Sequence, residues 1–159
     1  LDRMPWADRS RLGIMGGSYG GFMTTWIIGH DHGFRAAVSE RAVNDWYSMQ
    51  GASDIGGTFN RQYLGENATI QDDLDAVLRQ SPLSYAKHIE TPVLILHSEN
   101  DLRCPISQAE QLFVVLKQRR QDVEFVRFPD EDHELSRAGR PSHRVDRFNV
   151  ILDYLSRKL

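Results

Sequence analysis

The sequence has a single cysteine, Cys104, among its 159 residues, so the chain can form no internal disulfide bond. Such a chain is typical of a reducing compartment, which favours a cytoplasmic location. The sequence also has no excess of basic residues: 19 lysines and arginines stand against 22 aspartates and glutamates, a formal net charge of −3. This balance argues against a nucleic-acid partner and against recruitment to an anionic membrane surface.

Long hydrophobic runs are also missing from the sequence. No apolar run approaches the roughly 18 residues that a membrane-spanning helix needs, and no basic-then-apolar signal pattern opens the chain. The sequence shows no internal repeat and no low-complexity stretch. With 40% hydrophobic and 26% charged residues, it has the composition of a globular protein. Its length predicts one domain, spanning residues 1–159.

The hydrophobic pattern predicts strands that alternate with helices. Four short apolar runs are expected to be strands: 11–16, 34–39, 91–97 and 123–128. Three segments with helical spacing of apolar residues are expected to be helices: 21–28, 106–120 and 142–159, the last capped by Ser142. The continuous run TPVLILH is typical of a strand covered on both faces, hence of a parallel sheet. We therefore expect an α/β fold whose strand carboxyl ends share one edge, where open α/β sheets bind ligands.

Residues 42–83 depart from this alternation. Their aromatic and apolar side chains are scattered among glycine and asparagine residues. We expect an excursion of loops and short helices over the sheet edge, and not a separate domain.

Four glycines surround one serine in the segment GGSYGG, at residues 16–21. The segment lies between the first predicted strand and the first predicted helix, which is the context of a G-x-S-x-G nucleophile elbow. In such a sharp turn the serine backbone is strained, and we expect Gly16 and Gly20 to remove Cβ atoms that would collide. The hydroxyl of Ser18 would project from the turn, beside a helix N-terminus that favours developing negative charge.

Three other readings of this glycine-rich segment fit less well. A Walker phosphate loop needs a lysine before its serine or threonine, and none is present here. The dinucleotide pattern G-x-G-x-x-G fits only with two mismatches. A plain tight turn would not need glycines on both sides of the serine. The nucleophile elbow is therefore our preferred interpretation.

A serine hydroxyl is a weak nucleophile and needs a base within hydrogen-bonding reach. Of the six histidines, His133 directly follows the strand predicted at 123–128, whereas His143 lies at the start of the last helix. The histidines at positions 30 and 32 follow the first helix at the opposite end of the sheet, and those at 88 and 97 flank a strand and are read as structural. We therefore prefer His133.

The acid of such a triad is expected in the loop after the preceding strand. The segment LHSENDLRCP offers Glu99 and Asp101 there, and Asp101, just before the turn into the next helix, is preferred. A turn-forming or helix-capping role is the alternative for Asp101. Asp130 and Asp132 lie too close to His133 in sequence and are expected to solvate its loop.

Three segments together resemble the prolyl oligopeptidase family of serine peptidases: GGSYGG, HSENDLRCP and DHELSRAGRPSHR. The last two are most similar to its acylaminoacyl-peptidase branch, and the resemblance covers essentially the whole chain. It implies that Ser18 is the nucleophile, Asp101 the acid and His133 the general base. It also implies that the backbone N–H of Tyr19 is an oxyanion-hole donor. The implied reaction cleaves short peptides through an acyl-enzyme, and nothing in the motifs calls for a metal or an organic cofactor.

The same resemblance gives the excursion a role in substrate binding. In the family, this region lines the pocket for the residue that precedes the scissile bond. Val43 and Trp46 match those positions, and Tyr63 is expected to form a wall of the pocket. Arg103 follows the acid and is expected to reach the pocket, whereas Cys104 reads more simply as a small buried hydrophobe. Plain core packing is the alternative for the residues of the excursion.

The resemblance also predicts that parts of the enzyme lie outside this sequence. The α/β-hydrolase domain of the family has several strands before the elbow strand, but only residues 1–10 precede it here. We therefore expect the C-terminal half of an α/β-hydrolase fold, without the N-terminal strands, the β-propeller and the loop with the second oxyanion donor. The complementary N-terminal part of the same enzyme is the expected partner, and self-association into a homo-oligomer through the open strand edge is the alternative.

Three functions remain open from the sequence alone. The preferred one is a serine peptidase of acylaminoacyl-peptidase or oligopeptidase type that is active only with its N-terminal part. An esterase with the same triad is the nearest alternative. A non-catalytic fragment that acts only as a folding or assembly partner is the third.

Overall fold

A computed structural model describes residues 3–159 and contains a parallel sheet with the strand order β1-β2-β3-β4. The strands are β1 (Gly13–Gly17), β2 (Ala36–Glu40), β3 (Val93–Ser98) and β4 (Val123–Phe128). Every neighbouring pair is parallel. The predicted α/β class with a parallel sheet is confirmed.

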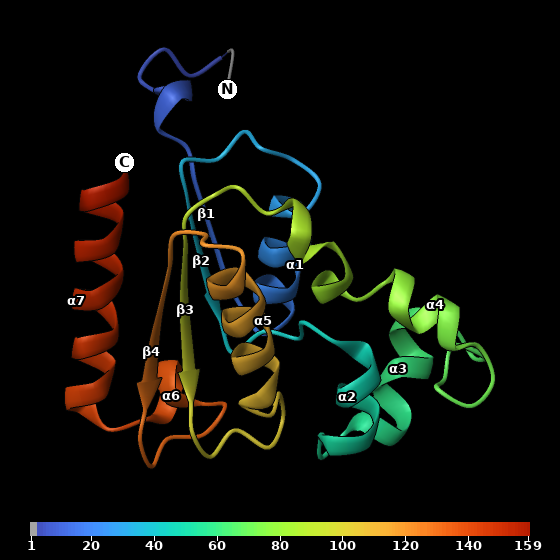
Figure 1. Cartoon of the computed structure of the whole chain (residues 1–159). Helices are drawn as coiled ribbons and strands as arrows, with labels where there is room; N and C mark the ends of the chain where they lie inside the picture. The colour runs from blue at the N-terminus through green and yellow to red at the C-terminus, as the bar shows by residue number, and fades with distance from the viewer. Residues whose placement is uncertain (1–2) are drawn as a thin grey trace.

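Helices cover both faces of the sheet (Figure 1). On one face pack α1 (Tyr19–Ile28) and α5 (Ser107–Gln118), and on the other α6 (Leu135–Ala138) and α7 (Pro141–Lys158). Ala37 and Val38 are neighbours in β2 but belong to the cores on opposite faces, and both are fully buried. This double covering explains why β2 begins with three consecutive apolar residues and β3 with four. No helix within residues 3–159 is long and apolar enough to span a membrane.

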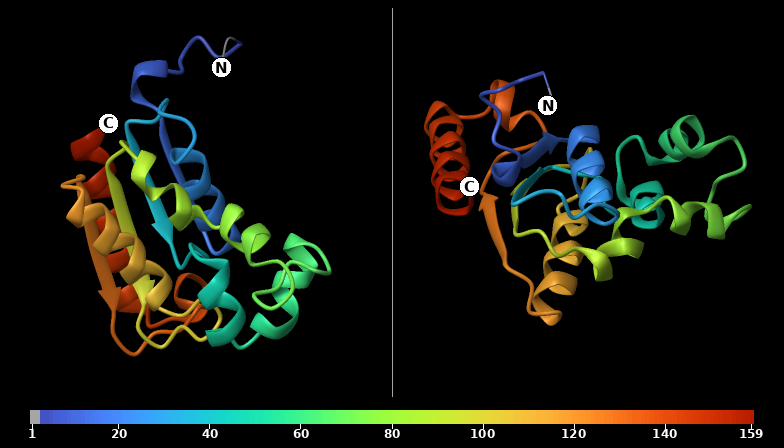
Figure 2. Two further views of the ribbon diagram at one scale, coloured as in Figure 1. Left: turned by 45° about the vertical axis from the view of Figure 1, so that its right-hand side comes forward. Right: turned by 90° about the horizontal axis from the view of Figure 1, so that it is seen from above.

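Between β2 and β3 the chain leaves the sheet and forms short helices. They are α2 (Trp46–Ala52), α3 (Gly56–Leu64), α4 (Leu74–Arg79) and a 3-10 helix (Pro82–His88). Figure 2 shows α2, α3 and α4 as a group to one side of the sheet. Their apolar core includes Trp46, Met49 and Val77, and it is shared with Phe22 of α1 and with Cys104. The helices between β2 and β3 therefore pack against α1.

The N-cap of the last helix lies two residues earlier in the chain than the sequence pattern predicts. Arg140 is its N-cap residue, Pro141 takes the first helical position, and no side chain caps the helix. Ser142 lies inside the first turn, so the prediction that it caps the helix was wrong. Proline has no backbone N–H, so one fewer donor at the start of the helix needs a hydrogen-bond acceptor. Its fixed φ also suits the first helical position.

In the described part of the chain, β1 forms one edge of the sheet and pairs only with β2. Met15 of β1 is 49% exposed, and two apolar side chains of α7, Phe148 and Leu152, are 58% and 63% exposed. Open strand edges and large exposed apolar side chains are features that proteins usually cover.

Candidate active site

Ser18 lies in the sharp turn between β1 and α1. Its backbone has φ 59° and ψ −120°, in a region that residues other than glycine rarely adopt. Two hydrogen bonds hold this strained residue: the Ser18 N–H donates to the Glu40 carbonyl oxygen at 3.0 Å, and the Phe22 N–H donates to the Ser18 carbonyl oxygen at 2.9 Å. The neighbouring strand and the first turn of α1 therefore fix the position of the hydroxyl.

The glycines that the turn requires are Gly16 and Gly21. A Cβ atom at Gly16 would lie 2.4 Å from the carbonyl oxygen of Gly20, and one at Gly21 would lie 2.6 Å from the carbonyl oxygen of Glu40. A Cβ atom at Gly20 would meet no described atom within 4 Å. The prediction for Gly20 was therefore wrong. The close contact is made by Gly21, the next residue of α1, which packs against the end of β2.

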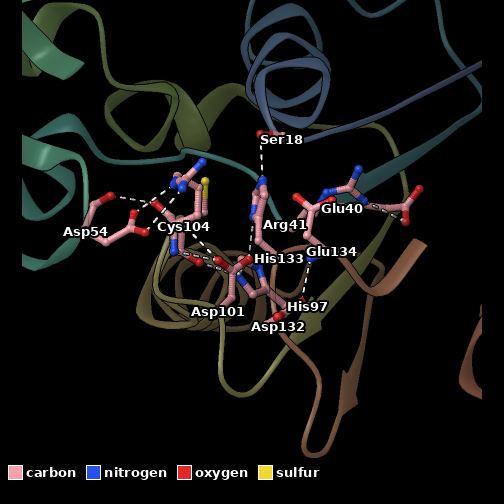
Figure 3. A network of polar contacts seen from close by, with 12 residues as sticks. Ser18, Glu40, Arg41, Asp54, His97, Asp101, Cys104, Asp132, His133 and Glu134 are labelled. Carbon is pink, nitrogen blue, oxygen red and sulfur yellow. Dashed lines mark hydrogen bonds and ion pairs between the residues drawn. The ribbon is translucent and has the colours of Figure 1, made fainter. Parts of the chain in front are cut away.

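Ser18, Asp101 and His133 come from three separate loops and meet at the carboxyl edge of the sheet (Figure 3). The His133 Nε2 atom lies 2.9 Å from Ser18 Oγ, and the His133 Nδ1 atom lies 2.8 Å from Asp101 Oδ2. The loops after β1, β3 and β4 reach the same edge because the strands are parallel. This geometry places a base beside a hydroxyl and an acid beside the base.

The carboxylate of Asp101 is 2% exposed and accepts hydrogen bonds on both oxygens. Oδ1 accepts the backbone N–H groups of residues 103 and 104 at 2.9 and 2.8 Å, and Oδ2 faces the rings of His133 and His97. Burial favours the neutral acid, but the hydrogen bonds from His133, His97 and the Cys104 N–H outweigh it and lower the pKa of Asp101 to about 2. Asp101 is therefore ionised at neutral pH and favours a proton on His133 Nδ1, which leaves Nε2 as an acceptor for the Ser18 hydroxyl.

A cavity of about 310 Å³ opens beside Ser18 and His133. Seven of its other lining side chains are apolar or aromatic: Tyr19, Val43, Met49, Ile55, Phe59, Tyr63 and Cys104. Three are charged: Arg103, Glu134 and Arg137. A larger cavity of about 470 Å³, lined by residues that include His32, Arg35 and Lys158, contains none of these side chains. The cavity beside Ser18 is the one that chemistry at the hydroxyl can use.

Of the four pocket residues predicted from the sequence, Val43, Tyr63 and Arg103 line this cavity and Trp46 does not. Trp46 is 1% exposed, and its ring packs behind those of Phe59 and Tyr63, with ring centroids 5.6 and 6.5 Å away. The expectation that Trp46 lines the pocket was therefore wrong. It lies at the first position of α2, with its indole turned into the core shared with α1.

Sequence reasoning missed five lining residues: Met49, Ile55, Phe59, Glu134 and Arg137. A signal for Phe59 was present, because it precedes Tyr63 by four residues and the two therefore share one face of α3. Met49 and Ile55 carried no such signal, since their orientation depends on how α2 and α3 pack together.

Glu99 and His143, the alternative candidates for the acid and the base, form hydrogen bonds to residues outside the group of Ser18, Asp101 and His133. Glu99 accepts a hydrogen bond from Arg127 at 3.0 Å in an exposed ion pair. His143 Nδ1 lies 2.7 Å from a carboxylate oxygen of Glu131, a residue that is 4% exposed. The structure therefore brings Asp101 and His133 to Ser18, and it holds Glu99 and His143 elsewhere.

A family model described as "Prolyl oligopeptidase family" matches residues 1–159. This chain belongs to the prolyl oligopeptidase family. Its relatives in the family include the "Uncharacterized peptidase YuxL" of Bacillus subtilis, 46% identical over the whole chain, and the acylamino-acid-releasing enzyme of Arabidopsis thaliana, 36% identical over 82% of it. The chain spans 24% and 18% of the length of these two relatives.

Solved structures of the prolyl oligopeptidase family agree with this assignment. The Pyrococcus horikoshii acylaminoacyl peptidase is 36% identical and superimposes with a TM-score of 0.93 over the whole chain, which corresponds to 25% of that protein. An acylaminoacyl peptidase in complex with Z-Gly-Gly-Phe-chloromethyl ketone is 37% identical, with the same TM-score and the same coverage. The family resemblance drawn from the three loops is confirmed, and the chain corresponds to the C-terminal region of the α/β-hydrolase domain.

Proposed function

We propose that this chain carries the catalytic triad of a serine peptidase that hydrolyses short peptides through an acyl-enzyme. The observation that carries the proposal is the continuous hydrogen-bonded path from Ser18 Oγ through His133 to Asp101, with steps of 2.9 and 2.8 Å. Membership of the prolyl oligopeptidase family supports a peptide substrate. Relatives named acylamino-acid-releasing enzymes favour the acylaminoacyl-peptidase type.

The proposed acylation step uses the three side chains in fixed roles. Ser18 Oγ attacks the scissile carbonyl carbon while His133 Nε2 takes the hydroxyl proton, and the carbonyl electron pair moves onto oxygen. Asp101 stabilises the imidazolium that forms. The N–H of Tyr19, the first residue of α1, has no acceptor within its helix and is available to the oxyanion.

Collapse of the tetrahedral intermediate breaks the C–N bond. His133 then donates its proton to the leaving amine, which departs as the shortened peptide. Water enters the site, His133 takes one of its protons, and the resulting attack releases the acyl group from Ser18. The proton returns to Ser18 Oγ, so the enzyme ends each cycle unchanged.

The lining of the cavity supports a large apolar side chain before the scissile bond. Val43, Phe59 and Tyr63 form much of its wall. A 37% identical acylaminoacyl peptidase has been solved with Z-Gly-Gly-Phe-chloromethyl ketone, a peptide-like molecule whose last residue is aromatic. We infer that an aromatic side chain of the substrate occupies the corresponding cavity of this protein.

We further propose that the N-terminal part of a full-length enzyme completes this site. The chain spans about a quarter of the length of the solved relatives, and one edge of β1 has no partner among the described residues. Met15 of β1 and two side chains of α7, Phe148 and Leu152, are large, apolar and exposed. Strands added next to β1 would pair with its open edge and bring the second oxyanion donor.

A labelling experiment tests the nucleophile. The full-length protein is treated with a fluorophosphonate probe, which reacts with activated serines, and the modified residue is located by mass spectrometry. We expect Ser18 to be labelled in the wild type, no labelling in Ser18→Ala, and normal labelling in the control Ser10→Ala, which changes an exposed serine near the start of the chain. Labelling that persists in Ser18→Ala would contradict the proposal.

A turnover experiment tests the substrate class. The full-length enzyme is given an N-acylated peptide amide and the matching ester, each with phenylalanine before the bond to be cut. We expect hydrolysis of the amide, and its loss in Ser18→Ala. Turnover of the ester alone would favour an esterase. Failure of residues 1–159 alone to react, with recovery when the N-terminal part is added, would support the requirement for that part.

A further inference from the structure

His97 is the fifth residue of β3, and its side chain is completely buried beneath the loop that carries Asp101 (Figure 3). Its Nε2 atom lies 2.7 Å from the carbonyl oxygen of Cys104 and 3.4 Å from Asp101 Oδ2. A carbonyl oxygen can only accept a hydrogen bond, so Nε2 carries the proton and donates it. One N–H group therefore faces both ends of the turn at residues 101–104.

The other ring nitrogen of His97, Nδ1, makes no hydrogen bond in the described chain that would explain a histidine at this position. Nδ1 is buried and has no hydrogen-bond partner among the described residues. An unpaired buried acceptor is unfavourable, and an apolar side chain at this position would avoid it. Neighbours in the same strand, such as Ile95 and Leu96, are apolar. The contacts of Nε2 are therefore the feature of His97 that an apolar residue could not replace.

We propose that His97 is a positioning residue for the catalytic acid. Its Nε2–H holds the Cys104 carbonyl against the end of β3 and so closes the turn around the carboxylate of Asp101. The same N–H faces the carboxylate oxygen that accepts from His133. This inference rests on the proposed function, because the orientation of Asp101 matters for turnover only where His133 serves Ser18.

The hydrogen bonds of Asp101 show how this positioning works. Its Oδ1 atom accepts two backbone N–H groups from the turn, at 2.9 and 2.8 Å. Its Oδ2 atom faces the two imidazoles, with His133 at 2.8 Å and His97 at 3.4 Å. The short bond to His133 is thus set by a carboxylate that the turn holds on one oxygen and His97 on the other. Without the Nε2–H of His97, the Cys104 carbonyl loses its hydrogen bond to β3, and the Oδ2 atom of Asp101 keeps His133 as its one described side-chain partner.

A matched pair of variants of the full-length enzyme separates this role from simple filling of the core. The side-chain nitrogen of glutamine can take the place of histidine Nε2. That of asparagine reaches only the place of Nδ1, which has no hydrogen-bond partner among residues 3–159. We expect His97→Asn to lower kcat about tenfold, the cost of losing a hydrogen bond to a charged group, with KM changed less than about twofold. His97→Gln should recover most of kcat. Active enzyme is counted by fluorophosphonate titration, so misfolded molecules do not enter the comparison.

A double-mutant cycle tests whether His97 acts through the acid. In the background of Asp101→Asn, the additional change His97→Asn should lower kcat by less than about twofold, because the carboxylate that it positions is already gone. Equal losses in both backgrounds would overturn the inference, as would equal kcat values for His97→Gln and His97→Asn.

Nitrogen NMR of the ¹⁵N-histidine-labelled wild-type enzyme gives a readout that does not depend on a variant folding. We expect His97 to carry its proton on Nε2, with a shift of that signal in Asp101→Asn. A proton on Nδ1 would overturn the inference. Ser18→Ala, assayed in parallel, separates a failure of the proposed triad from a failure of the proposed role of His97. If it retains turnover, the proposed function fails; if it is inactive while His97→Asn is fully active, only the role of His97 fails.

Discussion

Glu40 and Arg147 form a bidentate ion pair that joins the end of β2 to α7, between residues 107 positions apart in the sequence. Arg147 donates from Nε to Oε2 at 2.5 Å and from Nη2 to Oε1 at 2.6 Å, and Glu40 is 4% exposed. The backbone of the same glutamate accepts the N–H of Ser18. Glu40 therefore links the turn that carries Ser18 to α7, the helix on the opposite face of the sheet from α1.

Removing one partner of this pair should destabilise the protein. Arg147→Met would leave the buried Glu40 carboxylate with Arg41 as its nearest described cation, at 4.0 Å. We expect the free energy of unfolding to fall by about 3 kcal/mol, the usual cost of stranding a buried charge. Urea denaturation of the full-length protein measures this loss. The double variant Glu40→Leu, Arg147→Met should lose less, and a larger loss in the double variant would show that the pair is not what stabilises this junction.

The glycines of the elbow helix give a matched pair of substitutions. Gly21→Ala would place a Cβ atom 2.6 Å from the Glu40 carbonyl oxygen and 2.7 Å from the Ala42 Cβ, so the helix or the strand must shift. We expect a loss of about 2 kcal/mol, in the range for overpacking, and weaker labelling of Ser18. Gly20→Ala meets open space and should raise stability by about 0.5 kcal/mol through its higher helix propensity. Thermal unfolding of both variants checks the difference, and similar stability in the two would contradict the assigned contacts.

The sequence predicted those parts of the fold and site that depend on local pattern and on parallel topology. Ser18 could be placed from its glycines, and Asp101 and His133 from their positions after strands, because parallel strands deliver such loops to one edge. Gly21 and Trp46 could not be placed in this way. What surrounds them comes from segments distant in sequence, the end of β2 for Gly21 and the side chains of α1 and α3 for Trp46. No local pattern contains that information.

Cys104 should resist alkylation although it lines the cavity beside Ser18. Burial, together with the nearby negative charge of Asp101, raises the pKa of its thiol to about 12 from a usual value of 9.0. A raised pKa keeps the thiol protonated at neutral pH, so the reactive thiolate is about a thousandfold scarcer than in a free cysteine. We expect negligible modification by iodoacetamide at pH 8, a rate that rises about tenfold per pH unit, and rapid modification once urea unfolds the protein. Mass spectrometry of the Cys104 peptide follows the reaction, and modification at the rate of free cysteine at pH 8 would show that the thiol is neither buried nor protonated.

Val43 should control which side chain the cavity accepts before the scissile bond. It is 2% exposed, lies three residues after the end of β2, and forms part of the wall of the 310 Å³ cavity. Val43→Phe would fill part of that space, so a substrate with phenylalanine before the scissile bond should lose about tenfold in kcat/KM, while one with alanine should lose less than about twofold. Val43→Ala is the control that enlarges the cavity, and it should spare the phenylalanine substrate while weakening the alanine one. Because the fluorophosphonate probe does not fill the cavity, labelling of Ser18 should be equal in all three proteins. Equal losses for both substrates in Val43→Phe would show that the substrate side chain binds elsewhere, with the triad itself unaffected.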